Sequence, residues 1–322
     1  MYRQLESIAE LIRENSDFII IAHISPDGDT LGSSLALKCV MQRMNKRCSV
    51  VCDNRVPKVY AFLPYADGVL ATADAHPAEC CIAVDCADTG RLGTAVELFE
   101  GAKRTAVIDH HPTNAGYAQL NAVDGDAAAA GELMYELCLL LTGVLHEDTA
   151  TCLYTALMTD TGSFAYGNTR PRTHEIAARL LEAGVDHYDI NRKVYRTLPF
   201  SRVKLLGVAI NNMRLHEGGR VCISALTAEE LRLVGAADED TEGVIDHLRD
   251  VSTVEVAVLI RESAQDTYKV SLRSKLCADV SAISHRMGGG GHKHAAGYTA
   301  HGTLDDVYFT ALSLAAQALE EN

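Results

Sequence analysis

The sequence predicts an α/β fold in two domains: a larger N-terminal domain with a mostly parallel, helix-flanked sheet and a smaller C-terminal α/β domain. In the first half, short runs of β-branched and apolar residues alternate with helical patterns, which is typical of a parallel sheet covered on both faces. Three of these runs end in a polar cluster, and open α/β sheets bind ligands at the carboxyl ends of their strands. With 322 residues, the chain is long enough for two cores.

The elements of the first half follow from these patterns in order. Strands are predicted at Phe18–Ala22, Cys48–Cys52, Cys81–Val84 and Thr105–Ile108. Helices are predicted at the amphipathic N-terminus and at Leu31–Met44, Ala127–Leu141 and Pro171–Ala183. The last of these has proline at its start and Gly184 just past its end, which matches the usual start and stop preferences of helices.

The second half has its own set of elements after a polar segment that contains Pro199. We therefore predict a first domain over 1–185, a partly helical linker over 186–213 and a second domain over 214–322. Strands are predicted at Val221–Leu226, Val254–Ile260 and Tyr268–Leu272, and helices at Thr227–Leu233, Asp279–Met287 and Leu304–Leu319.

Composition excludes several classes of protein. A formal charge of −14 argues against a protein that coats long duplex DNA, although a local basic pocket can still bind a short anion. The ten cysteines form no C-x-x-C pair, which predicts free thiols in a reducing compartment. The N-terminus lacks the pattern of a signal peptide, and no apolar run approaches the roughly 20 residues of a membrane span. We expect a cytoplasmic protein with no membrane partner.

Histidines and aspartates gather where predicted strands and one helix end. They are His23, Asp27, Asp29, Asp85, His110, His111 and Asp160. Several acids that converge on one crevice repel each other unless cations lie among them. Mixed imidazole and carboxylate ligands suit Mn²⁺, Mg²⁺, Fe²⁺ or Zn²⁺, with manganese-like ions favoured, and this set is large enough for two ions. Taken singly, D-G-D is more often a turn, and an aspartate after a strand is often a helix N-cap.

A second candidate site is the glycine run in R-M-G-G-G-G-H-K-H-A-A-G, residues 286–297. Consecutive glycines let backbone N–H groups approach a ligand closely, so the run predicts an anion-binding loop. A flexible linker is the alternative. Residues 269–294 carry five Lys or Arg and one acid, and Arg273 among them could grip a phosphate with two hydrogen bonds. A solvated strand face is the competing interpretation of that charge.

The order of H-I-S-P-D-G-D, A-V-D-C, I-D-H-H-P-T-N, M-T-D-T-G-S-F and G-G-G-G-H-K-H-A-A-G resembles the DHH/DHHA1 phosphoesterases over nearly the whole chain. Within that family the chain looks most like the stand-alone NrnA-type group, whose members are oligoribonucleases (nanoRNases) and pAp phosphatases. The resemblance implies a DHH catalytic domain, a DHHA1 substrate-binding domain and an active site in the cleft between them.

The resemblance also implies roles for individual residues. One metal ion would be held by His23, Asp27 and Asp85, and a second by Asp29, Asp85, His110 and Asp160. Asp109 would orient a histidine, and His111 would face the scissile phosphate. The implied substrate-binding residues are Asn114, Arg273, Ser274, Gly289, Gly290, Gly291 and His292. The chain departs from the family at V-D-G-D-A-A-A-A-G-E, where relatives often have Ser or Thr, so no hydroxyl contact is expected there.

The implied activity is hydrolysis of short oligoribonucleotides (nanoRNA, dinucleotides) to mononucleotides and dephosphorylation of 3′-phosphoadenosine 5′-phosphate (pAp). The implied partners are short RNA or DNA oligonucleotides and nucleotides, as substrates. Two divalent ions, Mn²⁺ first and Mg²⁺ or another as options, would activate a water that attacks phosphorus. The nearest alternative is a cyclic-di-AMP or pApA phosphodiesterase of the same family. A manganese pyrophosphatase and a non-catalytic nucleotide sensor are more distant ones. The oligomeric state is left open, with a homodimer as one option.

Overall fold

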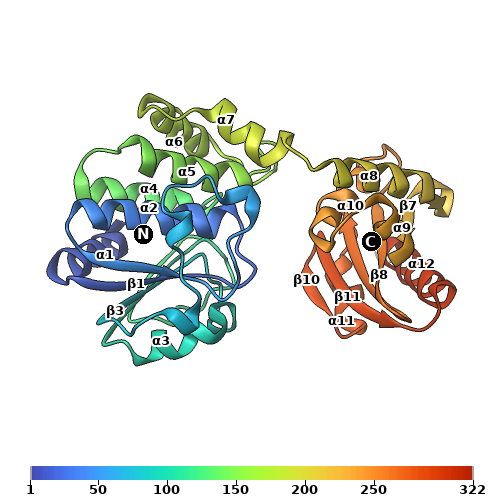
Figure 1. The fold of residues 1–322 in the computed structure, drawn as a ribbon, viewed down its shortest axis with the longest axis horizontal. Coiled ribbons are helices and arrows are strands. Elements are labelled where there is room, and N and C mark those ends of the chain that lie inside the picture. The colour runs from blue at the N-terminus through green and yellow to red at the C-terminus, as the bar shows by residue number, and fades with distance from the viewer. Residues whose placement is uncertain (1, 321–322) are drawn as a thin grey trace. The chain divides into compact units, whose positions relative to one another are not determined.

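The structure is a computed structural model that describes residues 2–320, in two compact units over Met1–Thr197 and Leu198–Asn322 (Figure 1). The segment predicted as a linker, 186–213, is largely helical: it contains α7 (His187–Asn191), a π-helical turn and α8 (Phe200–Asn212). No helix among residues 2–320 is long and apolar enough to cross a lipid bilayer.

The first unit is built on a five-stranded sheet in the order β2-β1-β3-β4-β5, with every neighbouring pair parallel. Its strands are β1 (Asp17–Ala22), β2 (Arg47–Val51), β3 (Cys80–Val84), β4 (Arg104–Asp109) and β5 (Leu120–Val123). The prediction of a parallel sheet flanked by helices is confirmed. The prediction missed β5, because L-N-A-V is too short and too mixed to show a strand pattern and forms only by pairing with β4.

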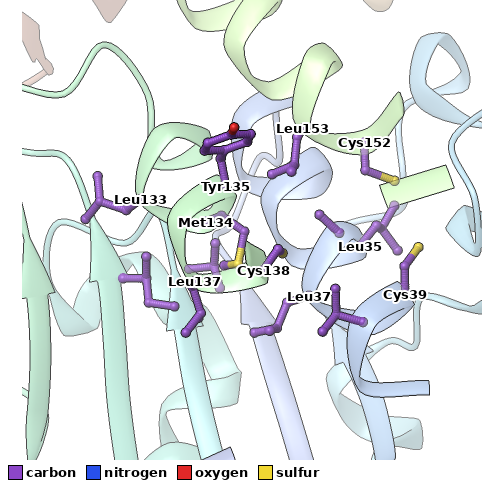
Figure 2. Packing of buried hydrophobic residues seen from close by; sticks show 14 of the residues in the cluster. Leu35, Leu37, Cys39, Leu133, Met134, Tyr135, Leu137, Cys138, Cys152 and Leu153 are labelled. Atoms are coloured by element: carbon purple, nitrogen blue, oxygen red, sulfur yellow. The ribbon is translucent and has the colours of Figure 1, made fainter. Parts of the chain in front are cut away.

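Helices cover both faces of this sheet. They are α1 (Tyr2–Glu14), α2 (Gly28–Arg43), α3 (Val96–Gly101), α4 (Ala130–Thr142), α5 (Glu147–Asp160) and α6 (Pro171–Glu182). Alternate strand residues face opposite layers: Phe18 and Ile20 pack with α1, α2, α4 and α5, whereas Ile19 and Ile21 pack with Phe99 of α3. Figure 2 shows the first of these layers, where Leu and Cys side chains of α2, α4 and α5 interlock.

Helix α2 packs very closely on α5, and glycines allow it. A Cβ on Gly28 would lie 2.4 Å from side-chain atoms of Thr159, and one on Gly32 would lie 2.4 Å from the carbonyl oxygen of Cys152. The prediction that α2 begins at Leu31 was wrong by one turn, since Gly28 is its first residue. The glycine of D-G-D therefore serves close helix packing and has no positive φ.

The second unit contains a six-stranded sheet in the order β10-β11-β9-β8-β7-β6, in which only β7 and β8 are parallel. Its strands are β6 (Arg214–His216), β7 (Val221–Leu226), β8 (Val256–Ala264), β9 (Thr267–Ser274), β10 (Gly290–His292) and β11 (Ala295–His301). The remaining helices are α9 (Ala228–Val234), α10 (Val244–Arg249), α11 (Val280–Arg286) and α12 (Leu304–Glu320). The smaller α/β unit was predicted, but β6, β10, β11 and α10 were not.

The glycine run, predicted as a loop, enters the sheet as β10 and pairs with β11. A Cβ on Gly289 would lie 2.2 Å from the carbonyl oxygen of Gly297, and Gly291 has φ +142° and no room for a side chain beside Ala296. Gly288 and Gly290, in contrast, face open space. Two of the four glycines are thus required by the close approach of β11.

Candidate active site

The turn from β1 into α2 places His23 and Asp27 side by side. Oδ1 of Asp27 caps α2 by accepting the backbone N–H groups of Asp29 (3.0 Å) and Thr30 (3.1 Å). Oδ2 of Asp27 lies 3.6 Å from Nε2 of His23. Oδ1 of Asp27 is therefore the helix cap, and Oδ2 is left as the candidate metal ligand.

Thr30 fixes this turn to the rest of the sheet. Its hydroxyl donates to the carbonyl oxygen of Val84 at 2.9 Å and accepts the backbone N–H of His23 at 3.2 Å. The side chain thereby ties the ends of β1 and β3 to the first turn of α2. Thr30 was not among the predicted site residues, because a threonine in a first helical turn carries no pattern of its own.

Asp85 follows β3 and lies between two histidines. Its φ of 58° is left-handed, an unusual conformation for a residue other than glycine, and the side chain is 3% exposed. Oδ2 lies 3.4 Å from Nε2 of His23, and Oδ1 lies 3.4 Å from Nε2 of His110. Oδ1 is buried without a hydrogen-bond partner among the described residues. A buried, unsatisfied carboxylate oxygen of this kind requires an explanation, and a cation is one.

His110, Asp29 and Asp160 form the second half of the site. Nε2 of His110 lies 3.5 Å from Oδ2 of Asp160, the last residue of α5, and 3.8 Å from Oδ2 of Asp29. Asp29, in the first turn of α2, is buried, and its carboxylate accepts the backbone N–H groups of Ala130 (2.6 Å) and Gly131 (3.0 Å) at the start of α4. The alanine run thus meets Asp29 through its backbone, and no hydroxyl is needed for that contact.

Asp109, at the end of β4, holds His111 in place. Its Oδ1 lies 2.8 Å from Nδ1 of His111, and its Oδ2 accepts a hydrogen bond from Nδ2 of Asn114 at 2.7 Å. The hydrogen bond to Asp109 raises the pKa of His111. Burial would raise the pKa of Asp109, but its partners His111 and Asn114 outweigh burial and hold the pKa below its ordinary value. Both N–H groups of the Asn114 amide are used, the second on the carbonyl oxygen of Cys86.

These side chains fit divalent cations. Three sets of ligand atoms could each hold an ion, namely those of His23, Asp27 and Asp85, of Asp29, His110 and Asp160, and of Asp85, His110 and His111. Two ligands that are each about 2.1 Å from one ion lie about 3.0–3.5 Å apart, which is close to the distances above. The ligands are imidazole nitrogens and carboxylate oxygens, the donors that such ions prefer.

The charges of the site also favour a cation. Burial lowers the pKa of His23, but Asp27 and Asp85 outweigh it and raise that pKa to about 10. The pKa of His110 is shifted in the same way: burial lowers it, but Asp85, Asp29 and Asp160 outweigh burial and raise it to about 10. Burial, followed by the charges of Asp85 and Asp160, raises the pKa of Asp29 well above its ordinary value. Negative charge is therefore in excess here, and positive charge is stabilised.

The other predicted residues belong to the second unit. Arg273 on β9 is half-buried, donates from Nη1 to the carbonyl oxygen of Leu272 and has Nε 3.8 Å from Asp246. Ser274 is 3% exposed, and its hydroxyl lies 2.8 Å from Nδ1 of His294. Gly290 and Gly291 are strand residues of β10, and Gly289 precedes them. The side chain of His292 lies outside the described residues.

The fold and the site agree with two protein-family models that match this chain. The model of the "DHH family, N-terminal domain" matches residues 17–157, and that of the "DHHA1 domain" matches residues 218–321. The first range contains six of the seven histidines and aspartates predicted from the sequence, all except Asp160. The chain belongs to the DHH family.

Individual relatives are similar over almost the full chain. A "bifunctional oligoribonuclease and PAP phosphatase NrnA" of Thermus thermophilus is 31% identical over 99% of this chain and 95% of its own length. A "probable bifunctional oligoribonuclease and PAP phosphatase NrnA" of Streptococcus mutans is 27% identical over 94% of this chain and 96% of its own length. An exopolyphosphatase-related protein from Bacteroides fragilis has the same fold, with 25% identity and a TM-score of 0.93 over 98% and 96% of the two chains. The predicted family and enzyme class, a DHH phosphoesterase, are confirmed.

Proposed function

We propose that this protein hydrolyses short oligoribonucleotides to mononucleotides and removes a phosphate from pAp. The observation that carries the proposal is the position of Asp85, whose two carboxylate oxygens each face a different histidine. A carboxylate of this kind can join two ligand sets into one phosphoester-cleaving centre. The names of the relatives from Thermus thermophilus and Streptococcus mutans supply the two substrate classes.

In the proposed centre, one ion would be held by His23, Asp27 and Asp85. The other would be held by Asp29, His110 and Asp160 together with Asp85. Mn²⁺ suits this mixture of imidazole and carboxylate ligands, and Mg²⁺ is the next option. When bound, such ions supply a nucleophilic water near neutral pH and neutralise charge on the phosphoryl group.

His111 is proposed to act on the reacting phosphate itself. Its Nδ1 is held by Asp109, so the tautomer and the orientation of the ring are fixed, and Nε2 remains for the substrate. In the protonated form, which Asp109 favours, Nε2–H donates a hydrogen bond to a phosphoryl oxygen or to the departing oxygen. Asn114 supports this arrangement through its hydrogen bond to Asp109.

The second unit is proposed to supply the contacts that select the substrate. Arg273 would pair with a terminal phosphate, and the backbone of Gly289, Gly290 and Gly291, with His292, would lie against the rest of the nucleotide. Ser274 would contribute by holding His294, because its hydroxyl is buried against that ring. The ten free cysteines are consistent with a reducing compartment, so we place the enzyme in the cytoplasm.

A substrate panel tests the proposal. Three substrates labelled in the adenine base, pApA, pAp and cyclic-di-AMP, are incubated with the Mn²⁺-loaded protein. EDTA provides the metal-free arm, and the products are separated by chromatography. We expect AMP from pApA and from pAp, and no product with EDTA. Turnover of cyclic-di-AMP alone would favour the phosphodiesterase alternative. Survival of both pApA and pAp would refute the proposal.

Two variants test which residues the activity requires, one at the metal centre and one at the proposed substrate contact. Asp85→Ala should lose activity on every substrate and lose Mn²⁺ binding by calorimetry, while Asp67→Ala, the same change at an exposed site, should retain both. Circular dichroism checks that the inactive variant is folded. Arg273→Ala should raise KM more than it lowers kcat, and an unchanged KM would count against its role.

A further inference from the structure

Arg91 lies directly beside the proposed metal centre. Its Nη2 is 2.9 Å from Nδ1 of His23, and the residue is half-buried in the segment Thr89–Ala95 that follows the Asp88 cap. The backbone of Arg91 already performs a structural task, because its carbonyl oxygen accepts the N–H of Ile24 at 2.9 Å. The side chain can therefore be replaced without removing the contact that joins this segment to the end of β1.

The tautomer of His23 decides what the Arg91 side chain can do. Nδ1 of His23 also lies 2.8 Å from the carbonyl oxygen of Ile24. If Nδ1 carries the hydrogen and donates it to Ile24, Nε2 keeps the lone pair that a cation requires. Nδ1 then cannot accept from Arg91. In the metal-binding tautomer, the nearest N–H groups of Arg91 have no acceptor on His23.

Arg91 has no carboxylate partner either within residues 2–320. This is unusual for an arginine beside a cluster of aspartates. A permanent positive charge beside a metal ligand also repels the cation that the ligand would hold. Both features are accounted for if an anion lies against the guanidinium during the reaction. A phosphoryl group meets that need, since its oxygens match the planar fork of arginine.

We infer that Arg91 is a catalytic residue that donates hydrogen bonds to a non-bridging oxygen of the substrate phosphate next to the ion held by His23, Asp27 and Asp85. This inference rests on the proposed phosphoesterase function. The Arg91 guanidinium would add a second positively charged side chain to that of His111, on the side of the site formed by His23. The ligand class is a phosphate monoester or diester, and the mononucleotide product belongs to it.

The competing explanation is that Arg91 only orients His23. The two explanations differ in which affinity changes. An orienting residue affects metal binding, whereas a phosphate-binding residue affects anion binding when the metal is saturating.

The experiment compares AMP and adenosine by calorimetry, with the full chain saturated with Mn²⁺. Wild type should bind AMP more tightly than adenosine. Arg91→Ala should weaken AMP binding about 10- to 100-fold, as expected for loss of a hydrogen bond between charged groups, with adenosine unaffected. Arg91→Lys should fall between the two. Arg179→Ala is the matched control, since it removes an arginine that is 67% exposed on α6 of the same unit and should behave as wild type.

Mn²⁺ titration of the nucleotide-free variants completes the test. We expect Arg91→Ala to bind Mn²⁺ as well as wild type or more tightly, because a repulsive charge is removed. A lower Mn²⁺ affinity with unchanged AMP affinity would establish the orienting role and overturn the inference, as would a wild type that does not prefer AMP to adenosine. If AMP binding depends on Arg91 but pApA and pAp are not hydrolysed, the phosphate contact stands and the proposed function fails.

Discussion

Nδ1 of His111 lies 2.8 Å from Oδ1 of Asp109, a carboxylate that is completely buried at the end of β4. The second oxygen of Asp109 is occupied by Asn114. The direction of the His111 ring is therefore set by a group that cannot itself rotate. A half-buried histidine held in this way is prepared for one orientation of its substrate.

Replacing the orienting carboxylate should slow the reaction with little effect on binding. In Asp109→Asn, the amide cannot accept from both His111 and Asn114 as the carboxylate does, so kcat should fall about 10- to 100-fold with a small change in KM. Steady-state kinetics on pAp measures both. Asp126→Asn, the same change at a side chain that is 86% exposed, is the control. An unchanged kcat would show that His111 does not need Asp109.

The packing of α2 on α5 should be sensitive to one methyl group. Gly28→Ala places a Cβ 2.4 Å from Thr159, so one helix must shift, and we expect a loss of about 1–3 kcal/mol in the free energy of unfolding. Urea unfolding followed by circular dichroism measures it. Gly101→Ala, where the new Cβ meets nothing within 4 Å, should be neutral or slightly stabilising. Thr159→Ala should recover part of the loss, and equal stability of both glycine variants would contradict the close packing.

A turn in the second unit should depend on pH through Glu255. Its Oε1 accepts the backbone N–H groups of Leu276, Cys277 and Ala278. Burial would raise the pKa of Glu255, but these three hydrogen bonds outweigh it and lower the pKa below the ordinary 4.5. Its contribution to stability is thus complete above about pH 4.5 and is lost as the pH falls through the lower folded value.

Glu255→Gln should therefore unfold at a lower urea concentration than wild type at pH 7. The difference should narrow as the pH is lowered below 4.5, because wild type then loses the same charge. Glu229→Gln, at an exposed position on α9, serves as the control and should match wild type throughout. A difference that stays constant with pH would show that the charge of Glu255 is not what holds the turn.

The ten thiols should differ sharply in reactivity. Cys277 is exposed, Cys48 is half-buried and the other eight are buried. Burial raises the pKa of Cys48 to about 11 and of Cys81 to about 12, which leaves little thiolate at neutral pH. Iodoacetamide at pH 7.5 should therefore label the native protein once, at Cys277, as peptide mapping by mass spectrometry can show. Cys277→Ser should abolish the rapid labelling, and early labelling of Cys81 would contradict the buried position.

Sequence patterns predicted the parts of this molecule that depend on local chemistry. The runs before His23, Asp85 and Asp109 are continuous and apolar, so their strands and the polar groups behind them could be assigned. Strands β5, β6, β10 and β11 were not predicted. β5, β6 and β10 are only three or four residues long, and β11 is rich in alanine, so hydrogen bonds to a neighbouring strand determine them instead.

The residues of the site also divide into those that local chemistry predicts and those that only the folded chain defines. The side chains of the three ligand sets were predicted because histidine and aspartate are common ligands of divalent metal ions. Thr30 and Arg91 were not, since their importance lies in distances to Val84 and His23 that only the folded chain defines. The D-G-D pattern predicts a turn at Gly28, but the structure requires glycine there because Thr159 packs against it. Thr159 is 131 positions away in the sequence, so no local pattern could indicate that contact.

Asp29 has two roles, as an acceptor for the first N–H groups of α4 and as a candidate metal ligand, and they affect the stability of the fold differently. Its oxygens accept the first N–H groups of α4, which favours folding, yet its charge is buried near those of Asp85 and Asp160, which opposes folding. An uncharged asparagine would relieve the repulsion, but its single oxygen could not accept both N–H groups, and it would be a poorer ligand for a divalent ion. Selection for turnover would therefore keep at this position a charge whose repulsion opposes folding.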